Sequence, residues 1–216
     1  METAKGWTPE KGTPQGAVIS PLLSNIYLTP LDHRMEEEEF AMVRYADDFV
    51  VMCRSQEEAE QALNTVREWV ENAGLTLHPE KTCLVDVRQP GGFDFLGYHF
   101  ERGYRWPTDR SLRKIKDSIR GKTKRANGHS LKAIIVRVNR TSRGWFEYFK
   151  HSHRNTFGSL DRWIRMRLRS ILRKRNHLKG RGRGRDHQRW PNAFFAERGL
   201  FSLTTAHTEA CQSALR

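Results

Sequence analysis

The stretch that decides the fold is Met42-Val43-Arg44-Tyr45-Ala46-Asp47-Asp48-Phe49-Val50-Val51-Met52-Cys53. Two apolar runs rich in β-branched residues flank a pair of adjacent carboxylates, which predicts a two-stranded hairpin with Ala46-Asp47-Asp48 at its turn. Aspartates are common at turns because their side chains bond the local backbone. Ordinary turn chemistry therefore explains the pair locally, and a metal site at Asp47 and Asp48 is the alternative.

A turn-rich loop and a helix are predicted before this hairpin. The loop, Lys11-Gly12-Thr13-Pro14-Gln15-Gly16, contains two glycines and a proline in six residues. It leads into apolar positions that are spaced like a helical stripe: Val18, Ile19, Leu22, Leu23, Ile26 and Tyr27. We expect a core helix here, with Ser20 near its N-cap and Pro21 in its first turn.

The segment after the hairpin predicts a second, amphipathic helix and further strands. Ser55 and Glu58 form a capping box, apolar residues from 59 to 70 share one face, and Gly74 stands where a C-terminal glycine belongs. The stretch 82–87 then alternates like a half-buried strand. Residues 93–100 are expected to form a strand pair pinched at Gly97, whose aromatic side chains are more often core than ligand contacts.

Charge is divided unevenly along the chain. The net charge is +13, but residues 1–100 carry 8 Lys and Arg against 17 Asp and Glu, whereas residues 101–216 carry 30 against 8. A half this basic predicts a polyanionic partner, with nucleic acid as the default candidate. An acidic membrane surface is the competitor, and the lack of a lipidation signal weakens it. No apolar run approaches the roughly 20 residues of a membrane span.

The basic half predicts helices and two candidate RNA contacts. The best-defined helix runs from about Ser159 to His177. One of its faces carries four arginines: Arg162, Arg165, Arg169 and Arg173. A solvated basic face would explain them, but few acids stand nearby, which favours a phosphate-binding surface. A glycine-alternating basic run then predicts a loop able to wrap an RNA backbone, through Lys179, Arg181, Arg183 and Arg185.

Cysteine and histidine spacing argues against a zinc site or a disulfide framework. Cys53, Cys83 and Cys211 are widely spaced and form no Cys-x-x-Cys pair. His151, His153, His177 and His187 could suggest a metal site, but neither cysteines nor carboxylates stand at ligand spacing beside them. Residues 1–11 lack the apolar core of a signal peptide, so we expect a reducing, cytoplasmic location.

Several motifs occur in the order found in group II intron-encoded reverse transcriptases (maturases). Four motifs in the first half resemble their reverse-transcriptase region: Gly-Thr-Pro-Gln-Gly-x-x-x-Ser-Pro-Leu-Leu-x-Asn-Ile-Tyr-Leu, Tyr-Ala-Asp-Asp, Leu-x-Leu-x-x-x-Lys-Thr and Phe-Leu-Gly-Tyr. In the second half, Gly-Trp-x-x-Tyr-Phe and residues 189–203 resemble the maturase-specific thumb, also called domain X. The chain therefore resembles the C-terminal part of such an enzyme.

The resemblance implies an α+β fold. A partial polymerase palm of antiparallel hairpins packed on helices is expected over residues 1–104. A mostly α-helical basic thumb is expected over residues 105–190, followed by a C-terminal tail over residues 191–216.

The resemblance also implies roles for individual residues. Asp47 and Asp48 would be catalytic carboxylates that bind Mg²⁺. Contacts to the incoming nucleotide and template would come from Pro14, Gln15, Gly16, Tyr45 and Lys81. Taken alone, Lys81 is equally well explained as a surface lysine. The primer grip, which holds the 3′ end of the primer, would be Phe95, Leu96, Gly97 and Tyr98.

The implied reaction is RNA-templated DNA synthesis by two-metal phosphoryl transfer, with intron RNA and an RNA/DNA hybrid as partners. The family uses a third aspartate on an earlier strand, and we expect this chain to start after it. Asp32 matches an ordinary linker instead. We therefore expect little polymerase activity from the chain alone, unless an upstream chain supplies the missing palm. The alternatives are a non-catalytic RNA-binding splicing cofactor, and a basic DNA- or membrane-binding protein with an accidental Asp-Asp turn.

Overall fold

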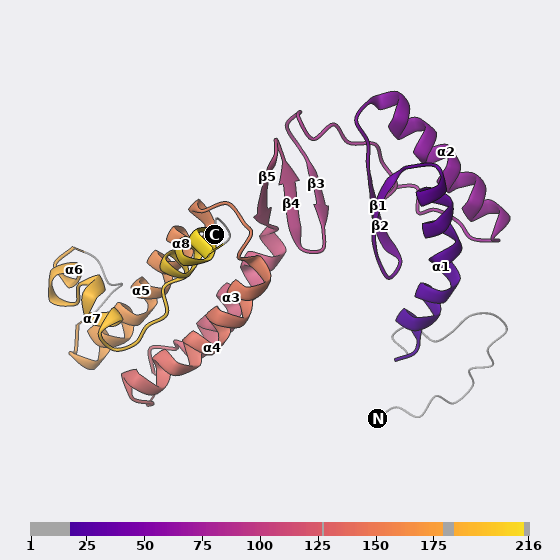
Figure 1. Cartoon of the computed structure of the whole chain (residues 1–216). Coiled ribbons are helices and arrows are strands. Elements are labelled where there is room, and N and C mark those ends of the chain that lie inside the picture. Colours follow the sequence, from indigo (N-terminus) through magenta and orange to yellow (C-terminus); the bar gives the residue numbers. More distant parts are fainter. Residues whose placement is uncertain (1–17, 127, 179–183, 214–216) are drawn as a thin grey trace, which may run out of the picture. The chain divides into compact units, whose positions relative to one another are not determined.

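The computed structural model describes residues 18–126, 128–178 and 184–213 (Figure 1). The chain divides into two compact units between Val85 and Asp86. Over the described residues, the units contain helices and two small antiparallel sheets. The expected α+β fold class is thereby confirmed.

The first unit is built around the predicted hairpin. Its elements are helix α1 (Ser20–Glu37), strands β1 (Ala41–Tyr45) and β2 (Asp48–Met52), and helix α2 (Gln56–Asn72). The strands are antiparallel, with Tyr45 opposite Asp48, so that only Ala46 and Asp47 form the turn. The hairpin is confirmed, and Asp48 lies in the second strand rather than in the turn.

A small core lies between the two helices and one face of this hairpin. Its buried residues are Leu31, Met35, Ala62, Val66 and Val70. Met42, Phe49 and Val51 pack against them from the strands. Because side chains alternate along a strand, the residues in between face away from this core, and Val43 and Tyr45 are 48% and 66% exposed. Asp48, opposite Tyr45, shares that outer face.

Helix α2 forms as its capping signals predict. The Oγ of Ser55 accepts a hydrogen bond from the backbone N–H of Glu58 at 3.2 Å. Gly74 follows the helix with a φ of 68°, a conformation that glycine adopts without steric cost. Trp69 packs, partly buried, against the core. The amphipathic helix is thus confirmed at both ends.

The first half of α1 differs from the expected core helix. The helix continues through Pro30 to Glu37, and the residues it buries are Leu31 and Met35. Its N-cap is Ile19, with no side-chain capping bond. The predicted apolar stripe is exposed instead, from 40% at Leu23 to 100% at Val18. The prediction was wrong because helical spacing identifies an apolar face but not what covers it, and no described element of this unit covers it.

The strand expected over residues 82–87 is also wrong. Residues 82–86 have no regular secondary structure, and Leu84 and Val85 are 47% and 39% exposed. A strand is stable only when a neighbouring strand completes its hydrogen-bond ladder. The alternating pattern is present here, but no described strand pairs with it.

The second unit begins with a three-stranded antiparallel sheet. Its strands are β3 (Phe93–Phe95), β4 (Tyr98–Glu101) and β5 (Tyr104–Pro107). The pinch at Gly97 is confirmed, since Leu96 and Gly97 form the turn with φ angles of 48° and 79°. The sheet belongs to the same compact unit as the helices that follow it. The division of family domains after residue 104 stays a prediction.

Helices make up the rest of this unit. They are α3 (Asp109–Lys122), α4 (Leu131–Phe149), α5 (Asn155–Arg175), α6 (Asp186–Arg189), α7 (Asn192–Ala196) and α8 (Leu203–Ser213). Buried side chains of the three long helices form one core with Trp190, Phe195 and Leu203. The predicted helical character of the basic half is confirmed. None of the described helices combines the length and the apolar character that crossing a membrane requires.

Candidate functional site

The carboxylates of Asp47 and Asp48 lie at the tip of the β1–β2 hairpin. Both residues are exposed, and neither carboxylate makes a hydrogen bond or ion pair with another residue that the structure describes. Their oxygens are therefore accessible to a cation, and carboxylate oxygens are the ligands that Mg²⁺ prefers. Two carboxylates fit part of a magnesium site but do not complete one. In the described ranges, no three His, Cys, Asp or Glu side chains gather to hold a metal ion.

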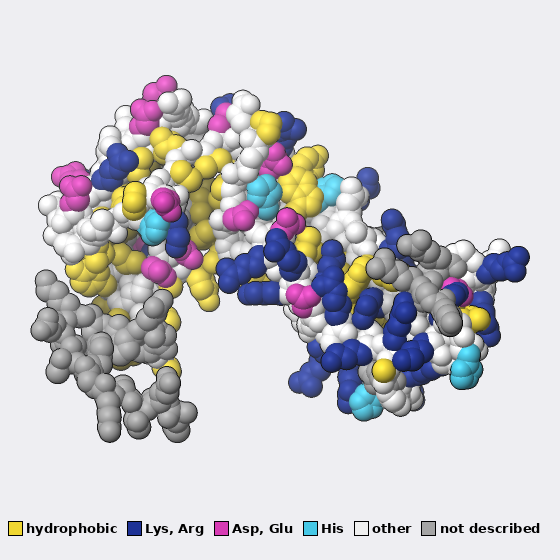
Figure 2. Space-filling model, turned by 180° about the vertical axis from the view of Figure 1, so that it is seen from behind, with side chains coloured by type: hydrophobic (Ala, Val, Ile, Leu, Met, Phe, Trp, Pro, Cys, Tyr) yellow, Lys and Arg dark blue, Asp and Glu magenta, His cyan; other side chains and the backbone are white. Residues whose placement is uncertain are grey.

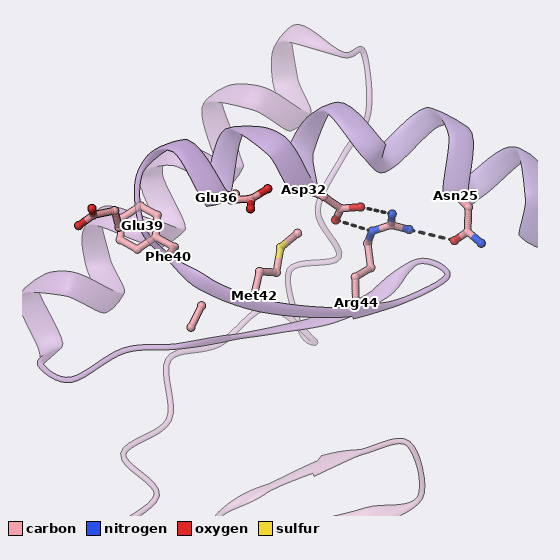
Figure 3. A pocket seen from close by; sticks show the side chains of 8 residues that line it. Asn25, Asp32, Glu36, Glu39, Phe40, Met42 and Arg44 are labelled. Atoms are coloured by element: carbon pink, nitrogen blue, oxygen red, sulfur yellow. Dashed lines mark hydrogen bonds and ion pairs between the residues drawn. The ribbon is translucent and has the colours of Figure 1, made fainter.

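Arg44 ties this tip to helix α1 (Figure 3). Its Nη1 donates to the carbonyl oxygen of Ala46 at 2.8 Å and to Oδ1 of Asn25 at 3.1 Å. Its Nε donates to Oδ1 of Asp32 at 2.7 Å, and its Nη2 pairs with the other oxygen of that carboxylate. The hydrogen bond to Asp32 raises the pKa of Arg44. Both Asp32 oxygens are thus engaged in holding the hairpin.

Reasoning from the sequence missed this role of Arg44. The residue occupies an inward position of β1, on the face that carries Met42. Its side chain is only 10% exposed. A cation at an inward strand position needs a partner, because an unpaired buried charge is costly. That alternation is the signal that could have identified it.

A pocket of about 730 Å³ opens beside this network (Figure 3). It is lined by residues of α1, β1 and the connection between them: Asn25, Asp32, Glu36, Glu39, Phe40, Ala41, Met42 and Arg44. Asp47 and Asp48 do not line it. The hollow therefore lies on the inner side of the hairpin, whereas Asp48 and Tyr45 share its outer face.

The residues predicted to contact the nucleotide lie in different parts of the chain. Tyr45 is 66% exposed beside Asp48. Lys81 is exposed in a turn, where its backbone N–H donates to the carbonyl oxygen of His78 at 3.2 Å. Pro14, Gln15 and Gly16 lie outside the described residues. Of the predicted nucleotide contacts, the structure thus brings Tyr45 to the carboxylate pair.

The predicted primer grip, residues 95–98, forms the β3–β4 turn of the second unit. The hydroxyl of Tyr148, on α4, donates to the carbonyl oxygen of Leu96 at 2.7 Å. In return, the hydroxyl of Tyr98 donates to the carbonyl oxygen of Tyr148. Burial raises the pKa of Tyr98. These reciprocal bonds fix the turn on α4, and its role in holding a primer stays a prediction.

The four arginines of α5 do not form one exposed surface. Arg169 is 2% exposed, and its guanidinium donates to the carbonyl oxygen of Trp190 and to Oδ1 of Asn192, both at 2.9 Å. Burial lowers its pKa. The Nη1 of Arg173 lies 2.6 Å from Oδ2 of Asp186, whose side chain is 5% exposed.

This corrects the expected phosphate-binding row. The four residues do share one side of the helix, as their spacing requires. However, the chain from Asp186 to Asn192 folds over the C-terminal half of that side. Its acceptors form hydrogen bonds with Arg169 and Arg173. Arg162 remains exposed and Arg165 partly exposed.

The predicted basic loop lies mostly outside the described residues. Lys179, Arg181 and Arg183 are not described, and Arg185 is exposed immediately before α6. Elsewhere on the second unit, Lys and Arg side chains gather over the face shown in Figure 2. A basic surface is therefore present, although the α5 row contributes less to it than expected.

Comparisons with known proteins agree with the order of these sites. Residues 1–100 match the reverse transcriptase (RNA-dependent DNA polymerase) family, and residues 112–190 match the maturase-specific domain of group II introns. The chain is 31% identical over 79 residues to the retron Ec86 reverse transcriptase of Escherichia coli. This alignment covers 35% of this chain and 25% of that protein.

A second relative extends across both units. The chain is 22% identical over 250 aligned positions to the putative COX1/OXI3 intron 1 protein of Saccharomyces cerevisiae, covering 83% of this chain and 28% of that protein. The chain thus spans about a quarter of the length of these relatives. Because a reverse-transcriptase match is followed by a maturase-specific domain, the chain belongs to the family of group II intron reverse transcriptase/maturases.

Proposed function

We propose that the chain carries part of the RNA-templated DNA polymerase site of its family and that its second unit binds intron RNA. The observation that supports the first part is the hairpin tip, where Asp47 in the turn and Asp48 at the start of β2 are exposed and where Arg44 bonds to Ala46. Magnesium, when bound there, would stabilise the charges that develop on the attacking and leaving oxygens of phosphoryl transfer.

The carboxylate pair needs a third ligand from elsewhere. No third acidic side chain joins Asp47 and Asp48 in the described ranges. Two carboxylates hold divalent ions weakly, so we propose that this polypeptide alone has little or no polymerase activity. A palm segment carrying a further aspartate, in a longer chain or a separate one, would complete the site.

The remaining family roles are part of the same proposal. Tyr45 and Lys81 would contact the incoming nucleotide and template, together with Pro14, Gln15 and Gly16. The β3–β4 turn would hold the primer end. In the cytosol, the basic second unit would assist splicing of the intron, a mobile element, by binding its RNA.

An RNA-templated extension assay tests the catalytic part. We expect the purified chain to show little Mg²⁺-dependent synthesis, and robust synthesis would contradict the proposal. Supplying a polypeptide with the missing palm region should restore synthesis. The double variant Asp47→Ala/Asp48→Ala should abolish the restored synthesis while leaving RNA binding unchanged.

A non-catalytic splicing cofactor is the second candidate function. It is favoured by the separate hydrophobic core of the second unit, which contains no residue of the first. In that case, no added palm segment restores synthesis, and Asp47→Ala/Asp48→Ala leaves splicing assistance intact. Restoration of synthesis by an added palm polypeptide, and its loss in the double variant, therefore separates the two candidates.

A further inference from the structure

A basic pocket lies at the junction between α3 and α4. Its volume is about 320 Å³, and its lining residues are Gly121, Lys122, Lys124, Ala126, His129 and Arg137. Three of these side chains are cations, another is a histidine, and no carboxylate lines the pocket. Lys124, His129 and Arg137 are exposed. A hollow with this lining suits a small anionic group.

Two arginines of α5 hold the loop that forms this pocket. The Nη2 of Arg167 donates to the carbonyl oxygen of Thr123 at 3.0 Å, and its Nε donates to the Oγ1 of the same residue at 3.1 Å. The Nη2 of Arg175 donates to the carbonyl oxygen of His129. Both ends of the loop are thereby fixed to α5 through carbonyl oxygens, groups that would otherwise repel an anion.

Acidic residues are sparse in the sequence around the pocket, where Asp117 is the only Asp or Glu between residues 110 and 146. Burial lowers the pKa of Arg167, and the nearby cations Arg120 and Arg125 lower it further. The carboxylate of Asp117, one helical turn away on α3, pairs with Arg120. Helix α4 has no acidic residue before Glu147. Cations that repel one another in this way are stabilised when an anion binds among them.

The basic surface continues from the pocket along α4. Arg140 is exposed one turn beyond Arg137. Consecutive cations along a helix suit a partner whose negative charges repeat, as the phosphates of a nucleic acid do. A single free phosphate would gain nothing from the cations further along α4.

We propose that the α3–α4 pocket, through Lys122, Lys124 and Arg137, holds a phosphate of an RNA backbone and replaces the α5 row as the main phosphate contact. This inference rests on the proposed RNA binding of the second unit and adds the site. Arg167 and Arg175 act as positioning residues, since they fix the loop from behind without reaching the ligand.

The test measures how binding of a fluorescent RNA hairpin to the whole chain depends on salt. In the double variant Lys124→Gln/Arg137→Gln, the slope of log K against log salt should become shallower by about 1, because the one phosphate held in the pocket loses most of its neutralising charge. The affinity at ~0.1 M salt should fall roughly tenfold or more. Both side chains are exposed, so the fold is retained, and circular dichroism checks this.

Two matched variants isolate the site from net charge. Arg54→Gln/Arg67→Gln removes the same charge from exposed positions of the first unit and should leave the slope unchanged. Lys124→Arg/Arg137→Lys keeps the charge of the pocket and should also keep the slope. An equal decrease of slope in the pocket and control pairs would overturn the inference, because net charge alone would then explain binding.

The outcomes separate this inference from the proposed function. Steep salt dependence in the unmodified chain, with no change in Lys124→Gln/Arg137→Gln, overturns the pocket but leaves RNA binding standing. In that case Arg162→Gln/Arg165→Gln, on the exposed end of α5, should reduce the slope instead. Absent or salt-insensitive binding by the unmodified chain overturns the proposed RNA binding itself, and the pocket with it.

Discussion

Arg169 and Arg162 lie two turns apart on α5 and share a side of the helix, yet their surroundings differ. Arg169 is buried against the ring of Phe195, 5.2 Å from its centroid, and bonds to two acceptors. Arg169→Ala should lower the free energy of unfolding by about 2–4 kcal/mol, because it removes buried packing and two charge-assisted hydrogen bonds. Urea unfolding followed by circular dichroism measures the change.

The matched control is Arg162→Ala on the same helix. Its side chain is exposed, so the free energy of unfolding should change by no more than about 0.5 kcal/mol. Equal effects of the two substitutions would show that Arg169 does not stabilise the fold through its buried bonds.

We expect His207 to make the stability of the second unit depend on pH. Its ring packs on Phe157 with centroids 4.7 Å apart, and burial is the main cause that lowers its pKa. The folded state thus binds the proton less tightly than the unfolded chain. Its contribution to stability is complete above the unfolded pKa of about 6.5 and is lost as the pH falls through the lower folded value.

The variant His207→Gln should therefore lose less stability than the unmodified chain between about pH 7 and pH 5. Urea midpoints measured across this range provide the comparison. An identical decline in both proteins would place the pH dependence on other groups.

Residues whose partners are close in sequence were predictable, and those with distant partners were not. The cap at Ser55 depends on a residue three positions away. The turn at Gly97 likewise depends on its immediate neighbours. Arg44 bonds across 12 residues to Asp32, and Arg169 across 21 residues to Trp190. Neither separation follows from local spacing, because the fold alone brings these pairs together.

At the scale of elements, the turns that contain Gly97 and Gly103 can be compared by what surrounds each glycine. Gly97 and Gly103 have φ angles of 79° and 75°. A Cβ atom on Gly97 would lie 3.1 Å from the Oγ of Ser111, whereas one on Gly103 would meet no atom within 4 Å. Gly103→Ala should cost about 1 kcal/mol for the backbone conformation alone, and Gly97→Ala should cost more.

Urea unfolding of the two variants measures this difference. Adding Ser111→Ala should recover part of the extra destabilisation in Gly97→Ala, since it removes the crowding oxygen. If Gly97→Ala and Gly103→Ala lose the same stability, the β3–β4 turn is not pressed against α3.

The Arg44–Asp32 ion pair joins the β1–β2 hairpin to α1, in addition to the apolar core that the two share. Arg44 and Asp32 should show a coupling free energy of about 1 kcal/mol in a double-mutant cycle with Arg44→Gln and Asp32→Asn, because the Arg44 side chain is only 10% exposed, whereas water screens the Asp32 side chain, which is 36% exposed. Urea unfolding of the four proteins gives the coupling. A value near zero would mean that the pair behaves like an exposed surface salt bridge.

Element types were easier to predict from the sequence than their surroundings. Periodicity located α1, but the half expected in the core is exposed. Alternation suggested a strand over residues 82–87, but no described strand pairs with it. A pattern describes what one segment offers, whereas burial and pairing require a second segment.

At the scale of the whole molecule, the division of charge follows the division into units. The second unit draws its core from residues 115–203 and carries most of the excess of Lys and Arg. A polypeptide of residues 86–216 should therefore unfold cooperatively and keep the salt slope of the whole chain for RNA. Circular dichroism and the RNA hairpin titration check both points, and a non-cooperative transition would contradict the separate core.

The first half of α1, which no described element of its unit covers, affects how long the protein persists in a cell. Its exposed apolar residues include Val18, Leu22 and Ile26. Chaperones and proteases act on chains that expose apolar surfaces. A folded chain that exposes such a surface is therefore subject to chaperone binding and degradation. We therefore expect the lifetime of the protein to depend on whichever segment or partner covers this helix.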